Sequence, residues 1–81
     1  MQMTTQTRTS RRSPNRRLQE LRINAGLSPN DLAVRAGVSG NVVRLAEKGY
    51  VPGPRIQFAI ARVFELLPLD IWPLDRQLER R

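Results

Sequence analysis

Residues 28–49, with the sequence SPNDLAVRAGVSGNVVRLAEKG, carry the clearest structural signals in this chain. Ser28 is followed by a proline and, three positions after the serine, by an aspartate, which is the pattern of a serine-capped helix start. Gly37 predicts the end of this short helix, because glycine adopts a left-handed backbone conformation without steric cost. Ser39 then predicts the start of another helix, over residues 40–48.

The spacing of apolar residues predicts a buried face for each of these two helices. The residues expected to face inward are Leu32, Ala33 and Ala36 in the first helix and Val43 and Ala46 in the second. The second helix would then have an outward face formed by Asn41, Arg44, Leu45 and Lys48. A short helix, a tight glycine turn and an outward-facing helix form a geometry that enters the major groove of DNA.

Further helices are predicted on both sides. Ser13 and Pro14 have the pattern of a helix start, and Gly26 that of the corresponding end. Another helix is expected from about Pro54, with an apolar stripe of Ile56, Ala59, Ile60, Val63, Phe64 and Leu67. Residues 69–72 are long enough for one more turn. Because no strand-type alternation is present, the predicted fold class is all-α, a compact bundle of four to five short helices.

Charge and hydropathy divide the chain into three parts. Residues 1–12 lack a hydrophobic period and are expected to form a disordered basic N-terminal arm, residues 13–73 the folded domain, and residues 74–81 a C-terminal tail. The net charge is +7, and residues 1–17 contain five arginines and no acidic residue. This excess favours a polyanionic partner, nucleic acid first, although a solubilising tail has the same composition.

Composition excludes several classes of protein. The chain of 81 residues has no Cys and no His, which argues against disulfide scaffolds, zinc fingers and catalysis by cysteine or histidine. The acidic residues show no metal-ligand spacing, so we expect no enzyme activity, no cofactor and no metal. No apolar run approaches the roughly 20 residues that span a bilayer, and residues 1–17 lack the apolar region of a secretory signal. A cytoplasmic protein is therefore expected, and one associated with the bacterial nucleoid if nucleic acid is its partner.

The chain resembles the lambda-repressor/Cro-like (XRE-type) helix-turn-helix family over roughly residues 15–72. The resemblance is carried by Leu21-Arg22, Ala25-Gly26-Leu27-Ser28, Leu32-Ala33, Ala36-Gly37-Val38-Ser39, Val43, Glu47, Gly49 and Leu69-Asp70-Ile71-Trp72. Ala-Gly-Val-Ser alone is a weak signal, but several motifs in the right order and spacing are specific. The resemblance implies a five-helix, lambda-repressor-like fold that binds DNA sequence-specifically.

The resemblance also assigns roles to residues. It implies that Arg22 and Glu47 pair to tie the first helix to the third, and that base edges are contacted by Ser39, Gly40, Asn41, Val42, Arg44 and Leu45. Arg44 is the strongest candidate, because arginine donates a fork of hydrogen bonds to guanine O6 and N7; a phosphate contact or a solvated side chain is the alternative. Asn41 suits adenine N6 and N7, and equally a local helix cap.

A second set of residues is expected at the DNA backbone: Ser28, Asn30, Lys48, Tyr50, Arg55, Arg11, Arg12, Arg16 and Arg17. For Lys48 and Arg55 the alternative is a plain surface charge, and for Tyr50 it is packing over its loop. The backbone N–H groups at the start of the helix after Ser28 suit a phosphate. The arm either lies along a groove or acts as a non-specific tether.

Some positions depart from the family pattern. Pro29 stands where the family often has glutamine, and Gly40 stands where it usually has a base-contacting side chain. Gly40 either permits close approach to the backbone or weakens base recognition. Leu45 and Ala46 exchange the family's polar and large apolar positions, which implies either a slightly rotated helix or a contact of Leu45 with a thymine methyl group.

The leading functional hypothesis is a sequence-specific double-stranded DNA-binding transcriptional regulator, a small repressor or Cro-like control protein of a phage, mobile element or bacterium. It would bind its operator as a monomer or as a weak homodimer. Some of the C-terminal apolar residues are expected to complete the core over the first helix and the others to form the dimer surface, for which the candidates are Leu69, Ile71, Trp72 and Leu74. The alternatives are an antitoxin-type interaction protein and a nucleic-acid binder of low sequence specificity, RNA included.

Overall fold

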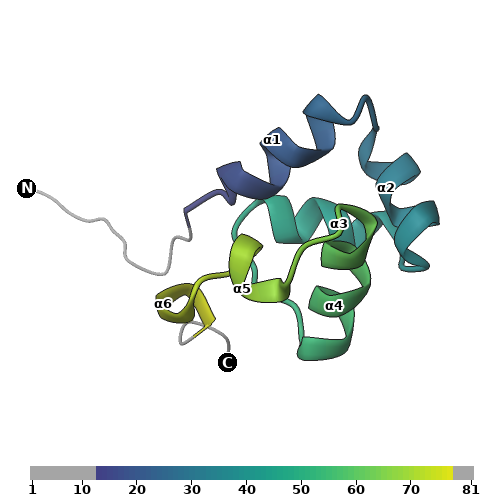
Figure 1. The fold of residues 1–81 in the computed structure, drawn as a ribbon. Coiled ribbons are helices and arrows are strands. Elements are labelled where there is room, and N and C mark those ends of the chain that lie inside the picture. Colours follow the sequence, from purple (N-terminus) through teal and green to yellow (C-terminus); the bar gives the residue numbers. More distant parts are fainter. Residues whose placement is uncertain (1–12, 78–81) are drawn as a thin grey trace, which may run out of the picture.

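The computed structural model describes residues 13–77, which form six helices (Figure 1). The helices are α1 (Arg16–Asn24), α2 (Pro29–Ala36), α3 (Gly40–Glu47), α4 (Pro54–Val63), α5 (Pro68–Ile71) and α6 (Leu74–Gln77). No strand occurs in residues 13–77, and the predicted all-α class is confirmed. The number of helices exceeds the predicted four to five, because the segment after Pro68 forms two single-turn helices on either side of Pro73.

The helix boundaries around Gly37 follow the capping residues. The Ser28 side-chain oxygen accepts a hydrogen bond from the Asp31 N–H (3.0 Å), and the Asp31 carboxylate accepts one from the Ser28 N–H (3.0 Å). Gly37 ends α2 with a φ of 75°. The Ser39 side-chain oxygen accepts from the Val42 N–H (3.2 Å) and caps α3. The predicted starts of both helices and the glycine stop between them are therefore confirmed.

The first helix begins later than the sequence predicts, since Ser13 is not its cap. Asn15 caps α1 instead, and its Oδ1 accepts from the Leu18 N–H at 3.0 Å. Asn15 is also buried; its backbone N–H donates to the Glu47 carbonyl (2.9 Å) and its Nδ2 to the Ile71 carbonyl (3.2 Å). Because an amide side chain has separate donor and acceptor atoms, the Asn15 side chain both starts α1 and links it to α5, while the Asn15 backbone N–H links α1 to α3.

The core lies where α1 to α5 meet. α2 packs against α3 and α4, α4 also contacts α5, and α1 contacts α3. The buried hydrophobic residues are Leu18, Leu32, Ala33, Val43, Ala46, Ile60, Ala61, Ile71 and Trp72. Leu67, predicted to belong to the apolar stripe of the fourth helix, lies beyond the end of α4 and is 64% exposed.

The C-terminal segment is more closely attached to the core than predicted. Ile71 and Trp72 are 1% and 0% exposed, so the prediction that they contribute to a dimer surface is wrong. They are buried because α5 packs on α4 and completes the interior. Only Leu69 and Leu74 of the four residues expected at that surface are exposed.

Residues 74–77, expected to belong to a tail, form α6, which is bonded to the rest of the fold. Gln57 is buried in α4 and exchanges amide hydrogen bonds with Gln77 (2.9 and 2.7 Å). The Gln77 Nε2 also donates to the Trp72 carbonyl (3.0 Å), and the Arg76 Nη1 donates to the Ser13 carbonyl (2.7 Å). The predicted arm, residues 1–12 with Arg11 and Arg12, and residues 78–81 lie outside the described part of the chain.

Candidate nucleic-acid interface

α3 has one buried face and one exposed face. Val43, Ala46 and Glu47 point into the molecule and are buried. The exposed residues are Ser39 at the cap, Asn41, Arg44 and Leu45 within the helix, and Lys48 at its end. Gly40 and Val42 are of intermediate exposure. The exposed residues within α3 share one side of the helix, because positions three and four apart lie on the same side, and they are polar or basic except for Leu45.

Arg22 and Glu47 form an ion pair that joins α1 to the buried face of α3. The Arg22 Nε lies 2.5 Å from Glu47 Oε2, and its Nη2 donates to Oε1 at 3.2 Å. The two side chains are only 16% and 11% exposed. The Arg22 Nη1 also donates to the Leu27 carbonyl (2.8 Å), in the loop before α2. This two-pronged contact fixes the orientation of α3 from behind.

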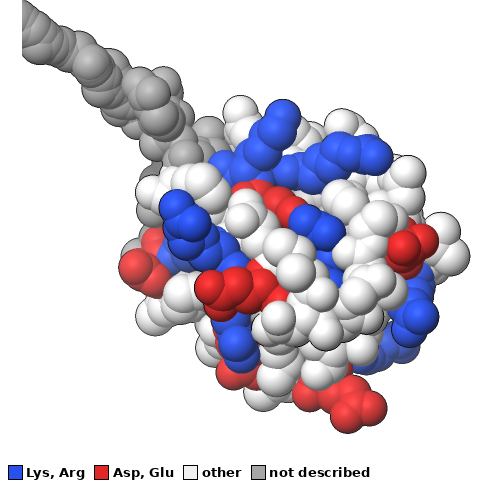
Figure 2. Space-filling model, turned by 90° about the horizontal axis from the view of Figure 1, so that it is seen from above, with Lys and Arg blue, Asp and Glu red and all other residues white. Residues whose placement is uncertain are grey.

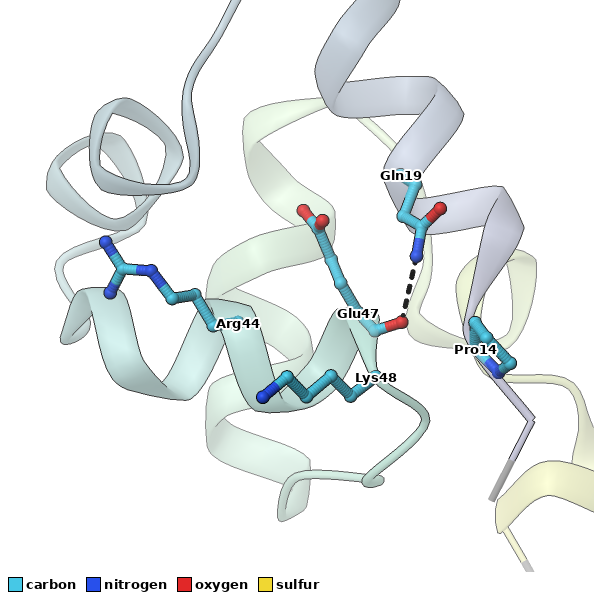
Figure 3. Close-up of a pocket in the computed structure, with 5 residues that line it drawn as sticks. All are labelled: Pro14, Gln19, Arg44, Glu47 and Lys48. Atoms are coloured by element: carbon cyan, nitrogen blue, oxygen red, sulfur yellow. Dashed lines mark hydrogen bonds between the residues drawn. The ribbon is translucent and has the colours of Figure 1, made fainter. Parts of the chain in front are cut away.

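A shallow depression of about 330 Å³ lies between the start of α1 and α3 (Figure 3). It is lined by Pro14, Gln19, Arg44, Glu47 and Lys48. The Gln19 Nε2 donates to the Glu47 carbonyl (3.1 Å) on the side of α1, and the side chains of Arg44 and Lys48 extend away from α1. Arg44 and Lys48 are both exposed and lie one helical turn apart, and two such cations suit a phosphate group.

The start of α2 is less open to a phosphate than the sequence suggests. The N–H groups of Ser28 and Asp31 are bonded within the capping box, and the proline at position 29 has none. Hydrogen bonds from the backbone and side chain of Ser28, followed by the charge of Arg35, lower the pKa of Asp31. A carboxylate that stays ionised at this end of the helix repels a phosphate. The contribution of α2 is therefore expected to come from side chains rather than from its backbone.

The side chain of Asn30 reaches from α2 to the exposed surface of α3. Its Oδ1 accepts a hydrogen bond from the Arg44 Nη2 at 2.9 Å. Gly40 lies directly under this contact, since a methyl group at position 40 would overlap Asn30 Oδ1 and lie 3.1 Å from Arg44 Nη1. The missing side chain at position 40, which the sequence alone leaves unexplained, thus provides the space for the contact between α2 and α3.

An apolar pocket of about 160 Å³ adjoins the other side of α3. It is lined by Val42, Leu45, Ala46, Tyr50, Val51 and Pro52. Leu45 and Tyr50 are 37% and 47% exposed, so both are accessible from solvent. The pocket is large enough, and its lining is apolar enough, to accept a methyl group such as that of thymine.

The remaining predicted backbone contacts are exposed and lie on α1 and α4 rather than on α3. Arg16 lies in the first turn of α1, and the Arg17 Nε donates to the Asp70 carbonyl at 3.4 Å. Arg55, in the first turn of α4, lines a separate depression with Phe58, Ala59 and Arg62. Figure 2 shows basic and acidic side chains intermixed on the face that it presents.

Two buried polar residues were not predicted from the sequence: Asn15, which bonds to the end of α3, and Gln57, which bonds α4 to α6. Asn15 had a usable signal, because asparagine is among the preferred helix caps. Gln57 had none, since its partner Gln77 lies 20 positions away in a segment that lacks any helix signal of its own.

Within residues 13–77 no group of three or more acidic residues is placed to hold a metal ion. No helix among these residues has the length and apolar character needed to cross a membrane. Comparison with protein-family models, with curated proteins and with solved structures finds no match for this chain.

Proposed function

We propose that this protein is a sequence-specific double-stranded DNA-binding transcriptional regulator, with α2 and α3 forming a helix-turn-helix of the lambda-repressor/Cro-like type. The observation that carries the proposal is the orientation of α3: Asn41, Arg44 and Leu45 are exposed, while α2 and the Arg22–Glu47 pair hold the helix from behind. An exposed, firmly supported helix of this length fits the width of the major groove.

The exposed side chains have the chemistry that base recognition requires. The guanidinium of Arg44 matches guanine O6 and N7, the amide of Asn41 matches adenine N6 and N7, and the methyl groups of Leu45 match the thymine methyl. A good bidentate pair of this kind contributes about 1–3 kcal/mol of discrimination against the wrong base. The capping of α3 by Ser39 leaves the Asn41 side chain available, because the cap hydrogen bond is already made.

The phosphate contacts in this proposal supply affinity without sequence information. Lys48 lies beside Arg44 at one depression, and Arg55 begins α4. The five arginines of residues 1–17 add charge that releases counterions when it meets the DNA backbone. The protein would act by occupying an operator and altering access of RNA polymerase, in a phage, a mobile element or the bacterial nucleoid.

The decisive experiment is selection of bound duplexes from a random pool. We expect an enriched motif in which Arg44→Ala removes the preference at one guanine, whereas Lys48→Ala lowers affinity equally for all sequences. Arg62→Ala is the matched control, because this exposed arginine lies in the last turn of α4. Equal affinity for selected and random duplexes would overturn the proposal, and tighter binding of RNA would favour the low-specificity alternative.

Self-association is a second part of this proposal and rests on exposed leucines. Leu67, Leu69 and Leu74 are 64%, 59% and 68% exposed, near the C-terminal end of the described chain. Exposed apolar side chains mark a contact surface where they form one contiguous patch, and a two-fold dimer would bind a palindromic site. Sedimentation at micromolar concentration is expected to show dimer that Leu69→Ser/Leu74→Ser abolishes. A monomer that binds one half-site tightly would exclude the dimer, and a stable complex with a different protein through these leucines would favour the antitoxin-type alternative.

A further inference from the structure

The contact between Asn30 and Arg44 joins the two helices of the proposed DNA-binding unit on its exposed side. We propose that Asn30 is a positioning residue that holds the Arg44 guanidinium in the orientation needed to contact guanine. The absence of a side chain at Gly40 provides the space for this contact. The inference deepens the proposed function and rests on it.

The hydrogen bond to Asn30 orients the Arg44 side chain and uses only one of its N–H donors. Asn30 Oδ1 binds one terminal nitrogen, Nη2, at 2.9 Å. An arginine has five N–H donors in a planar fork, so both terminal nitrogens retain a hydrogen for a guanine. A solvent-exposed arginine otherwise populates many rotamers. A single fixed acceptor on the neighbouring helix restricts that freedom before DNA arrives.

The space left by the missing side chain at position 40 is occupied by Asn30 and Arg44. Any side chain at that position would begin with a carbon that overlaps Asn30 Oδ1 and lies 3.1 Å from Arg44 Nη1. The glycine is the first residue of α3 and its φ is not positive, so no backbone strain requires it. Alanine favours helix more than glycine does, which leaves the space for Asn30 and Arg44 as the structural use of Gly40.

The choice of an amide as the acceptor also fits a DNA contact. Asparagine orients the guanidinium without neutralising it, so the full positive charge remains for guanine and the nearby phosphates. A carboxylate at position 30 would form a stronger, charge-assisted bond with Arg44 and would compete with the base. The neighbouring acid, Asp31, is instead held within the capping box by Ser28.

Two variants separate this role from folding. Asn30→Ala removes the acceptor, and Gly40→Ala displaces it while keeping both polar side chains and strengthening the helix. Asn24→Ala is the matched control, since Asn24 is an exposed asparagine at the end of α1. The DNA readout is the ratio of affinities for a selected duplex with guanine or 7-deazaguanine at the position that Arg44→Ala identifies. This ratio is unaffected by a lower folded fraction, which weakens both affinities equally.

We expect each of the two variants to lower the ratio by about threefold to tenfold, the range expected from ordering one long side chain on binding. Asn24→Ala should leave it unchanged. In the free protein, NMR relaxation of the Arg44 Nε–H should show a more mobile guanidinium in both variants than in the wild type. Combining Asn30→Ala with Arg44→Ala should change the ratio no further than Arg44→Ala alone.

The two proposals fail differently. A wild-type protein without sequence preference overturns the proposed function, and with it the role of Arg44 in base recognition. A wild-type protein that prefers one sequence, with Asn30→Ala and Gly40→Ala discriminating as well as it does, overturns only the positioning role. A ratio that rises in Asn30→Ala also overturns it, because Asn30 would then be withdrawing Arg44 from the base.

Discussion

The Arg22–Glu47 pair is a largely buried polar contact whose loss we expect to destabilise the fold strongly. Glu47→Ala would leave the Arg22 guanidinium with only the Leu27 carbonyl in a largely desolvated place. Breaking a buried pair from one side typically costs about 3–5 kcal/mol, and the residual exposure of this one lowers our expectation to about 2–3 kcal/mol. Urea denaturation measures the change in free energy of unfolding.

The control for this prediction is Glu20→Ala, which removes an exposed glutamate from α1. We expect it to change stability by less than about 0.5 kcal/mol, as exposed substitutions usually do. The apolar pair Arg22→Met/Glu47→Leu should recover most of the loss, because it leaves no buried charge without a partner. If Glu47→Ala unfolded like Glu20→Ala, the pair would contribute nothing to holding α3.

The lowered pKa of Asp31 predicts a loss of stability at acidic pH. Its pKa lies below the usual 3.8 in the folded state, chiefly because the Ser28 backbone N–H bonds to its carboxylate. A lowered folded-state pKa means that the capping box stabilises the fold fully above pH 3.8 and loses this contribution as pH falls through the folded-state pKa. Thermal unfolding across this range should show wild type losing its advantage over Asp31→Asn. Parallel curves for the two proteins would contradict the prediction.

Two substitutions test which residue determines the start of α1. Asn15→Ala removes the cap of α1 and the side-chain bond to the Ile71 carbonyl, whereas Ser13→Ala removes a hydroxyl that caps nothing. A lost cap costs about 1 kcal/mol, and an unpaired buried carbonyl adds about 1–3 kcal/mol. Chemical denaturation should therefore show a loss of about 2–4 kcal/mol for Asn15→Ala and almost none for Ser13→Ala. The reverse order would restore Ser13 as the start.

How much of each helix could be predicted depended on whether its signals were local. Ser28, Gly37 and Ser39 act on residues within four positions, so the ends of α2 and the start of α3 followed from the sequence. The start of α1 did not, because Ser13-Pro14 and Asn15 offer adjacent caps and the choice depends on bonds to Glu47 and Ile71. The end of α4 was also hidden, since Glu65 follows it with a positive φ of 58° where a glycine would be expected.

In the whole molecule, charge is concentrated at the N-terminal end, and this predicts a salt dependence. Deleting residues 1–12 removes Arg8, Arg11 and Arg12 and leaves the described fold. The slope of log affinity for DNA against log salt concentration should become shallower by up to about 0.9 for each phosphate that these arginines neutralise, roughly 2 to 3 altogether. Filter-binding or fluorescence titrations at several salt concentrations measure it. An unchanged slope would show that residues 1–12 do not bind DNA.

The candidate site was predictable in composition and only partly in arrangement. The outward direction of Asn41, Arg44 and Lys48 followed from helical spacing, and the Arg22–Glu47 pair was implied by the family resemblance. The bond between Asn30 and Arg44 was not foreseen, because it joins residues 14 positions apart and depends on a missing side chain. The roles of Ile71 and Trp72 were misjudged for a similar reason: only the tertiary fold decides which of several clustered apolar residues are covered.

The fluorescence of Trp72 reports on the unfolding of this protein. It is the one tryptophan in the chain, it is 0% exposed, and its indole Nε1–H has no acceptor among the described residues. An indole in such apolar surroundings emits at short wavelength and shifts to the red when water reaches it. Because Trp72 lies at the end of α5 and its ring is buried in the core, its fluorescence follows the cooperative unfolding of the whole bundle. Loosening of α5 alone should appear as a red shift that precedes the loss of helical circular dichroism.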